Sequence, residues 1–196
     1  LGSSSELKLA ADTGFSMNGH AQTLGKLTSE TGSLTQLDSG HLTLTEGGTV
    51  SGELAGNGLL TLAGGTLTVA NANNALEAKT TIAQGAAAIL GNTLGLGKGD
   101  IELAGALNLQ SAAGTLYNNL SETVTVGISS SDFILAGNNA SFAGTFAVDT
   151  DAALTATAAE QLGSASVDNA GSFTLNTDDN WSLVNQVSGS GTVVKD

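Results

Sequence analysis

One segment of this chain occurs twice in closely related form, as Leu96–Leu109 and again as Leu162–Leu175. The copies start at positions 96 and 162, which gives an offset of 66. Each copy begins with Leu-Gly and ends with a glycine followed by two apolar residues two positions apart. A long, fixed period of this kind is typical of proteins that stack copies of one structural unit. The repeat therefore predicts an elongated solenoid in place of a globular core.

Shorter matches extend the repeat with small changes in spacing. Leu116–Ser121 matches Leu183–Ser188, and the offset there is 67. Gly56–Leu60 matches Gly189–Val193 at an offset of 133, about twice the period. Offsets that vary by a residue or two indicate turns of variable length. We expect one elongated domain over 1–196, with less regular coils in 1–53 and clear 66-residue repeats in 54–196.

The local pattern is that of short β-strands. Apolar and polar residues alternate over three to five positions between glycine, asparagine, aspartate or serine, which suit turns. Three strand-and-turn units would form one coil of roughly 22 residues, and three coils one repeat. The predicted fold is all-β: a right-handed parallel β-helix of about nine coils, roughly 40 Å long. The clearest alternating segments are Leu42–Leu44, Leu60–Leu62, Thr66–Val69, Thr123–Val126 and Phe173–Leu175.

Side-chain chemistry fits a slim interior. Leucine, isoleucine, valine and alanine are expected to point inward, and threonine, serine, asparagine and aspartate outward. The asparagine pairs Asn73-Asn74 and Asn138-Asn139 are expected at corners, in left-handed conformations or in stacked amide ladders. Two alanine-rich segments, 83–90 and 152–162, have helical propensity. We assign both to strand and corner, because they occupy matching positions of the repeat.

Composition and charge exclude several classes of protein. The chain has 27 glycines among 196 residues, no proline and no cysteine, so disulfides and thiolate metal sites are excluded. Its apolar content of 40% argues against disorder. Five basic residues against 18 acidic ones, a net charge of −13, leave no basic patch for nucleic acid or an anionic membrane.

Several segments resemble the passenger-associated repeat of bacterial autotransporters. The resemblance implies a β-helical segment of a larger passenger at the surface of a Gram-negative cell, exported and held in the outer membrane by a C-terminal β-barrel. Many such passengers are adhesins that drive aggregation, biofilm formation or host attachment. The resemblance also implies that Trp181 packs over the end of a coil. The segments that carry it are Gly56–Leu62, Leu135–Thr145, Leu162–Ala165, Asn169–Leu175 and Val187–Lys195.

Candidate catalytic residues are few. The two histidines are His20 and His41, and the segment Leu37-Asp38-Ser39-Gly40-His41 invites comparison with serine hydrolases. It lacks the Gly-x-Ser-x-Gly turn that exposes a nucleophilic serine. It also coincides with a Gly-x-Leu-x-Leu strand of the repeat. We therefore predict no catalytic residue and no enzymatic activity.

Calcium is the metal for which the sequence offers ligands. The candidates are Asp149 with Asp151, and Asp178 with Asp179, while Asp100 and Asp168 are isolated carboxylates. Ca²⁺ requires six to eight oxygen ligands, and neither an EF-hand loop nor the calcium-binding nonapeptide is present. We assign these residues to solvated turns and predict no metal and no cofactor.

Three functional hypotheses follow. The first is an adhesin segment that binds another copy of itself, a host matrix protein or a glycan through many weak contacts. The second is a structural spacer that presents an N-terminal domain and promotes coil-by-coil folding. The third, a β-helix polysaccharide lyase or hydrolase, requires a cluster of charged catalytic groups that the sequence does not offer. Adhesin and spacer are not separable from sequence.

Overall fold

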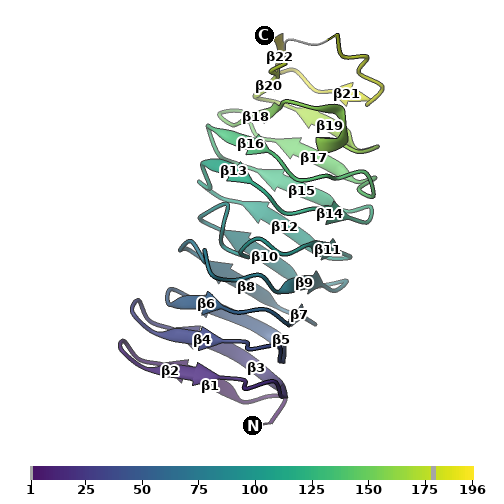
Figure 1. Cartoon of the computed structure of the whole chain (residues 1–196). Coiled ribbons are helices and arrows are strands. Elements are labelled where there is room, and N and C mark those ends of the chain that lie inside the picture. Colours follow the sequence, from purple (N-terminus) through teal and green to yellow (C-terminus); the bar gives the residue numbers. More distant parts are fainter. Residues whose placement is uncertain (1, 178–179) are drawn as a thin grey trace.

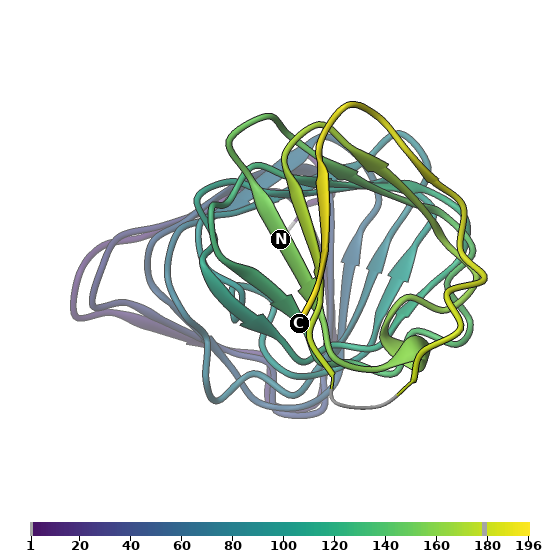
Figure 2. The same cartoon turned by 90° about the horizontal axis from the view of Figure 1, so that it is seen from above.

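The computed structural model, which describes residues 2–177 and 180–196, is a parallel β-solenoid of about nine turns (Figure 1). Every strand pairing in the described part of the chain is parallel and joins one coil to the next. The coils lie one above another along the long axis, and the view down that axis shows them overlapping, with the N-terminal coils projecting to one side (Figure 2). The predicted all-β parallel solenoid is therefore confirmed.

The strands stack in three rows, which the chain visits in turn on each coil. Rows 1 and 2 belong to one 14-stranded sheet, because β3 and β5 run through both of them. Row 1 holds the first halves of β3 (Ala21–Ser29) and β5 (His41–Val50), then β7 (Leu59–Leu62), β9 (Lys79–Ile82), β11 (Ile101–Leu103) and β14 (Leu120–Ser121).

Row 2 runs along the whole solenoid. It holds β1 (Glu6–Leu9), the second halves of β3 and β5, β8 (Thr66–Val69), β10 (Ala87–Leu90), β12 (Ala106–Leu109), β15 (Thr125–Ile128), β17 (Thr145–Val148), β19 (Ser166–Asn169) and β21 (Val187–Ser188).

Row 3 is divided into an N-terminal and a C-terminal sheet. Between the two sheets, coils pass through 70–78 and 91–100 without a strand on this side. The N-terminal sheet contains β2 (Gly14–Ser16), β4 (Leu34–Gln36) and β6 (Glu53–Ala55); the C-terminal one contains β13 (Gly114–Leu116), β16 (Phe133–Leu135), β18 (Ala153–Ala156), β20 (Ser172–Leu175) and β22 (Thr192–Lys195).

The coil is shorter than the sequence predicted. Paired residues are between 18 positions apart, as for His41 and Leu59, and 21 apart, as for Thr66 and Ala87. Along row 2, Leu107 is related to Val167 by three successive pairings, so three coils advance the numbering from 107 to 167. That advance falls short of the 66-residue period. The prediction that three equal coils make up one repeat is therefore wrong.

A step of 66 residues along the chain passes through three complete coils and then ends in the next row. It relates Leu103 in row 1 to Asn169 in row 2, and Leu107 in row 2 to Phe173 in row 3. A strand that follows a tight glycine corner needs the same local pattern in every row, because each row has an inner and an outer side. Similar sequence segments therefore identify the strand-and-corner pattern, but they do not show in which row each strand lies.

The core is a single column of inward-pointing aliphatic side chains. In row 1 the inward residues form two lines in register from coil to coil: Leu42, Leu60, Thr80, Ile101 and Leu120 in one, and Leu44, Leu62, Ile82 and Leu103 in the other. In the C-terminal half the column also contains four fully buried phenylalanines. The predicted inward aliphatic residues are confirmed, although the aromatic contribution is larger than a slim interior suggested.

The two alanine-rich segments each contain one strand together with corner residues, as assigned. Residues 87–90 form β10, and 153–156 form β18. A single 3₁₀ turn, η1 (Ala159–Gln161), follows β18 and departs from the assignment. It is held by the Gln161 side chain, whose Oε1 accepts from the Thr157 backbone N–H at 2.7 Å.

The corner asparagines behave differently from the prediction. Neither Asn73 nor Asn139 has a positive φ; both side chains are fully buried and bind backbone groups of adjacent coils. Asn73 accepts from the Leu54 N–H at 2.8 Å and donates to the Gly95 carbonyl at 2.6 Å. Buried amides of this kind replace backbone pairs at corners where the strand ladder is interrupted.

Thr80 is a fully buried polar member of the inward line in row 1. Its hydroxyl is buried and has no hydrogen-bond partner in the described part of the chain. Valine has nearly the same shape without the hydroxyl, and a buried unpaired polar group costs about 1–3 kcal/mol. We expect Thr80→Val to raise the free energy of unfolding by about 1 kcal/mol, measured by urea denaturation. Thr68→Val, on the outward side of row 2, serves as the control and should change it by less than about 0.5 kcal/mol.

Candidate functional site

A polar groove crosses the outer side of row 1 in the middle of the solenoid. It arises because the strands of row 1 shorten along the axis, from four residues in β9 to three in β11 and two in β14. In the next coil a single bridge, Glu122 with Phe142, continues the pairing. Residues 138–141 form no strand there, and Asn138, Ala140 and Ser141 form one wall of a cavity of about 380 Å³.

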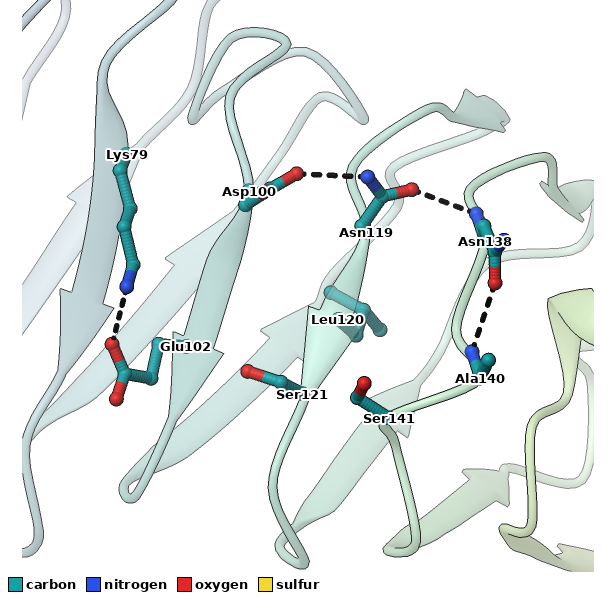
Figure 3. A pocket seen from close by; sticks show the side chains of 9 residues that line it. All are labelled: Lys79, Asp100, Glu102, Asn119, Leu120, Ser121, Asn138, Ala140 and Ser141. Atoms are coloured by element: carbon teal, nitrogen blue, oxygen red, sulfur yellow. Dashed lines mark hydrogen bonds and ion pairs between the residues drawn. The ribbon is translucent and has the colours of Figure 1, made fainter.

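The first side of the groove is a hydrogen-bonded line of three polar residues (Figure 3). Asn119 Nδ2 donates to Asp100 Oδ1 at 2.9 Å, and the Asn138 backbone N–H donates to Asn119 Oδ1 at 2.7 Å. Asn138 Oδ1 in turn accepts from the Ala140 N–H at 3.1 Å. Each bond joins neighbouring coils or closes a local turn, so the amide planes are fixed before any ligand binds.

The second side lies two positions further along the chain at Glu102 and Ser121, and three positions further at Ser141. It consists of Glu102, Ser121 and Ser141, which extend from successive coils (Figure 3). Lys79 Nζ lies 2.8 Å from Glu102 Oε2 across β9 and β11. That hydrogen bond and charge lower the pKa of Glu102 and raise the pKa of Lys79. Both groups are therefore charged at neutral pH, and Glu102 is held in place.

The sequence candidates for a hydrolase are not assembled into a catalytic group. Ser39 Oγ donates to Asn57 Oδ1 at 3.0 Å, and His41 Nε2 lies 2.9 Å from Thr61 Oγ1. Asp38 accepts from the Ser16 hydroxyl at 2.8 Å. Each side chain thus contacts a neighbouring coil, and these contacts join no serine to a histidine. His20 lies at a corner, exposed, with its backbone N–H bound to the Met17 carbonyl.

The candidate calcium ligands are also dispersed. Asp149 accepts from the Ser129 hydroxyl, and with Asp151 it lines a shallow cavity of about 360 Å³. Asp168 is exposed in β19, and Asp100 belongs to the groove. Within residues 2–177 and 180–196, no three histidine, cysteine or acidic side chains come together as metal ligands. Asp178 and Asp179 lie outside the described residues.

Trp181 packs against the hydrophobic core and is partly buried. Its position near the C-terminal coils agrees with the packing role expected from the sequence. The groove on row 1, in contrast, was missed at the sequence level. The available signal was the match of Leu116–Ser121 to Leu183–Ser188, because Asn118 and Asn185 make equivalent bonds to Gly97 and Gly163. That match marks a shared corner geometry but does not reveal that the adjacent row ends.

A band of threonines lies N-terminal to the groove on the same outer side. Thr23, Thr43, Thr61 and Thr81 are paired in register on four successive coils. The next two positions of this line are Glu102 and Ser121. Successive coils are about 4.8 Å apart, so the outer side of row 1 presents a regular line of hydroxyls that leads into the groove.

Comparison with known proteins places the chain beside two long proteins of Escherichia coli (strain K12). It is 37% identical over 196 residues to a protein described as the uncharacterized lipoprotein YdeK, and 45% identical over 195 residues to one described as the uncharacterized protein YuaQ. The chain spans 15% and 14% of their lengths. No family model and no solved structure matches the chain. In the described residues, no helix has the length and apolar character required to cross a membrane.

Proposed function

We propose that this chain is a segment of a cell-surface adhesin that attaches cells to one another or to a host matrix. The observation that carries the proposal is the continuous polar line on the outer side of row 1, from Thr23 through Thr81 to the groove at Asn119. A repeated line of hydroxyl and amide groups offers many equivalent weak contacts, and the strength of attachment grows with their number.

Two further observations support a surface location. The first is the resemblance to autotransporter passengers, which implies an anchor in the outer membrane. The second is that a relative with 37% identity is described as a lipoprotein. The relatives are several times longer than this chain, so the activity of the whole protein is part of the same proposal.

A spacer is the second candidate function. It is favoured by the parallel ladder that runs through all coils, which makes the molecule an elongated stack (Figure 1). A stack in which each coil contacts mainly its neighbours can fold progressively from one end. A spacer needs the ladder and the core, whereas an adhesin also needs a particular outer surface.

Surface display distinguishes the two functions. The chain is displayed on a Gram-negative strain that does not aggregate, and cell settling and attachment to matrix-coated plates are measured. We expect settling or attachment, and we expect Thr23→Lys, Thr61→Lys and Thr81→Lys together to abolish it by breaking the line in row 1. Thr28→Lys, Thr49→Lys and Thr68→Lys, on the outer side of row 2, are the matched control.

Two results of this experiment would contradict the proposal. If the displayed chain causes neither settling nor attachment, the adhesin function is wrong and the spacer remains. If both triple variants reduce attachment equally, the effect is one of general surface charge, and the assignment to row 1 fails.

A further inference from the structure

The groove on row 1 has polar groups that the fold itself does not use. The hydroxyls of Ser121 and Ser141 and the side-chain amide nitrogen of Asn138 have no hydrogen-bond partner in the described part of the chain, although all three line the cavity. Asp100 uses Oδ1 for the bond to Asn119. The groove therefore offers both donors and acceptors to a ligand.

The spacing of these groups suits a ligand with several hydroxyls. Two positions along a strand are about 6.6 Å apart, and neighbouring coils are about 4.8 Å apart. The line Asp100–Asn119–Asn138 and the line Glu102–Ser121–Ser141, which are two positions apart in the first two coils and three in the third, form a small grid of polar groups on the two sides of the groove (Figure 3). Ala140 adds a methyl group to the lining. A volume of about 380 Å³ falls in the range of small-molecule sites.

Charge narrows the class of ligand. The lining carries one lysine and two acids, and the Lys79 ammonium is already paired with Glu102. The whole chain has a net charge of −13. An anionic ligand would meet an acidic surface whose cation is occupied, and a second acidic copy would be repelled. A neutral ligand incurs no such cost.

We propose that this groove binds a neutral saccharide, with the ring hydroxyls held by Asn138, Ser121, Ser141 and Asp100. The inference rests on the proposed adhesin function and names the partner of the same surface. The fixed amide planes of Asn119 and Asn138 preorganise the site, which lowers the entropic cost of binding. Single sites of this size bind weakly, and repeated display on a cell surface compensates through avidity.

The test is a titration followed by the side-chain amide signals of Asn119 and Asn138 in ¹H–¹⁵N NMR spectra. The probes are the neutral oligosaccharides maltotetraose, cellotetraose, fully N-acetylated chitotetraose and mannotetraose, together with a heparin tetrasaccharide and tetralysine. We expect at least one neutral probe to shift both signals saturably and the heparin tetrasaccharide to leave them unchanged, while any shift caused by tetralysine, which the acidic surface attracts, should disappear at high salt.

Two double variants give the controls. Ser121→Ala with Ser141→Ala removes hydroxyls that no protein group uses, so the fold should persist and affinity should fall about tenfold, as expected for two lost hydrogen bonds. Ser188→Ala with Ser190→Ala, at two exposed serines outside the groove, should leave affinity unchanged.

The inference is overturned if no neutral probe shifts the signals, if a charged probe shifts them instead, or if both double variants behave alike. Its failure is separable from failure of the adhesin function. If displayed cells still settle although the groove binds no saccharide, the adhesin function stands and the proposed ligand is wrong.

Discussion

Replacing Phe146 by alanine is expected to lower the free energy of unfolding by about 3–5 kcal/mol. Phe146 is fully buried in β17, and its ring centroid lies 5.0 Å from that of Phe142 at an interplanar angle of 53°. The change removes a large apolar side chain, leaves a cavity and breaks an aromatic contact. Urea denaturation followed by circular dichroism measures the loss.

The matched control is Tyr117→Ala, because Tyr117 is an aromatic residue that is 58% exposed. That change should alter the free energy of unfolding by less than about 0.5 kcal/mol. Amide hydrogen exchange adds a local test. In a stacked fold the loss of protection should concentrate in β15, β17 and β19, which are consecutive in row 2. Equal losses for both variants would contradict a core that depends on this phenylalanine column.

Replacing Asn73 by alanine is expected to destabilise the chain by about 3 kcal/mol. The side chain is fully buried and satisfies the Leu54 N–H and the Gly95 carbonyl on the two adjacent coils. Removing it leaves both backbone groups buried without partners, at about 1–3 kcal/mol for each. Thermal and urea denaturation measure the effect.

Asn74→Ala is the control for this corner, because Asn74 is the exposed neighbour of the buried amide. It should be nearly neutral. If the two variants were equally stable, the corner amide would not hold the coils together, and the solenoid would rely on strand pairing and the apolar column alone. Asn139 makes the same pair of contacts, to the Leu120 N–H and the Gln161 carbonyl, so Asn139→Ala should reproduce the loss.

Much of the fold could be predicted from the sequence, because it is encoded locally. Alternation in segments such as Leu60–Leu62 and Thr66–Val69 specifies strands with one buried side, and both segments are strands in the structure. The coil length could not be obtained in this way. The spacing of similar segments equals whole coils only if they occupy the same row, and Leu107 and Phe173 do not.

The functional residues were harder to predict than the strands. Asn119 and Asn138 stand in polar surroundings of a kind that recurs along the chain. What makes them distinctive is the early end of row 1 at β14 and the turn in 138–141 that lines the groove. Those features depend on how one coil pairs with the next, which a single sequence does not state.

The sequence by itself determined that this chain stacks short parallel strands around an apolar column and carries a polar, acidic surface. Those properties follow from alternation, glycine corners and charge, which act over a few residues or over the whole composition. The tertiary structure alone decided that a step of 66 residues passes through three coils and ends in the next row. It also decided that buried asparagines join the corners, and that row 1 ends in a groove. Each of these depends on the register between one coil and the next, and inter-coil pairing sets that register.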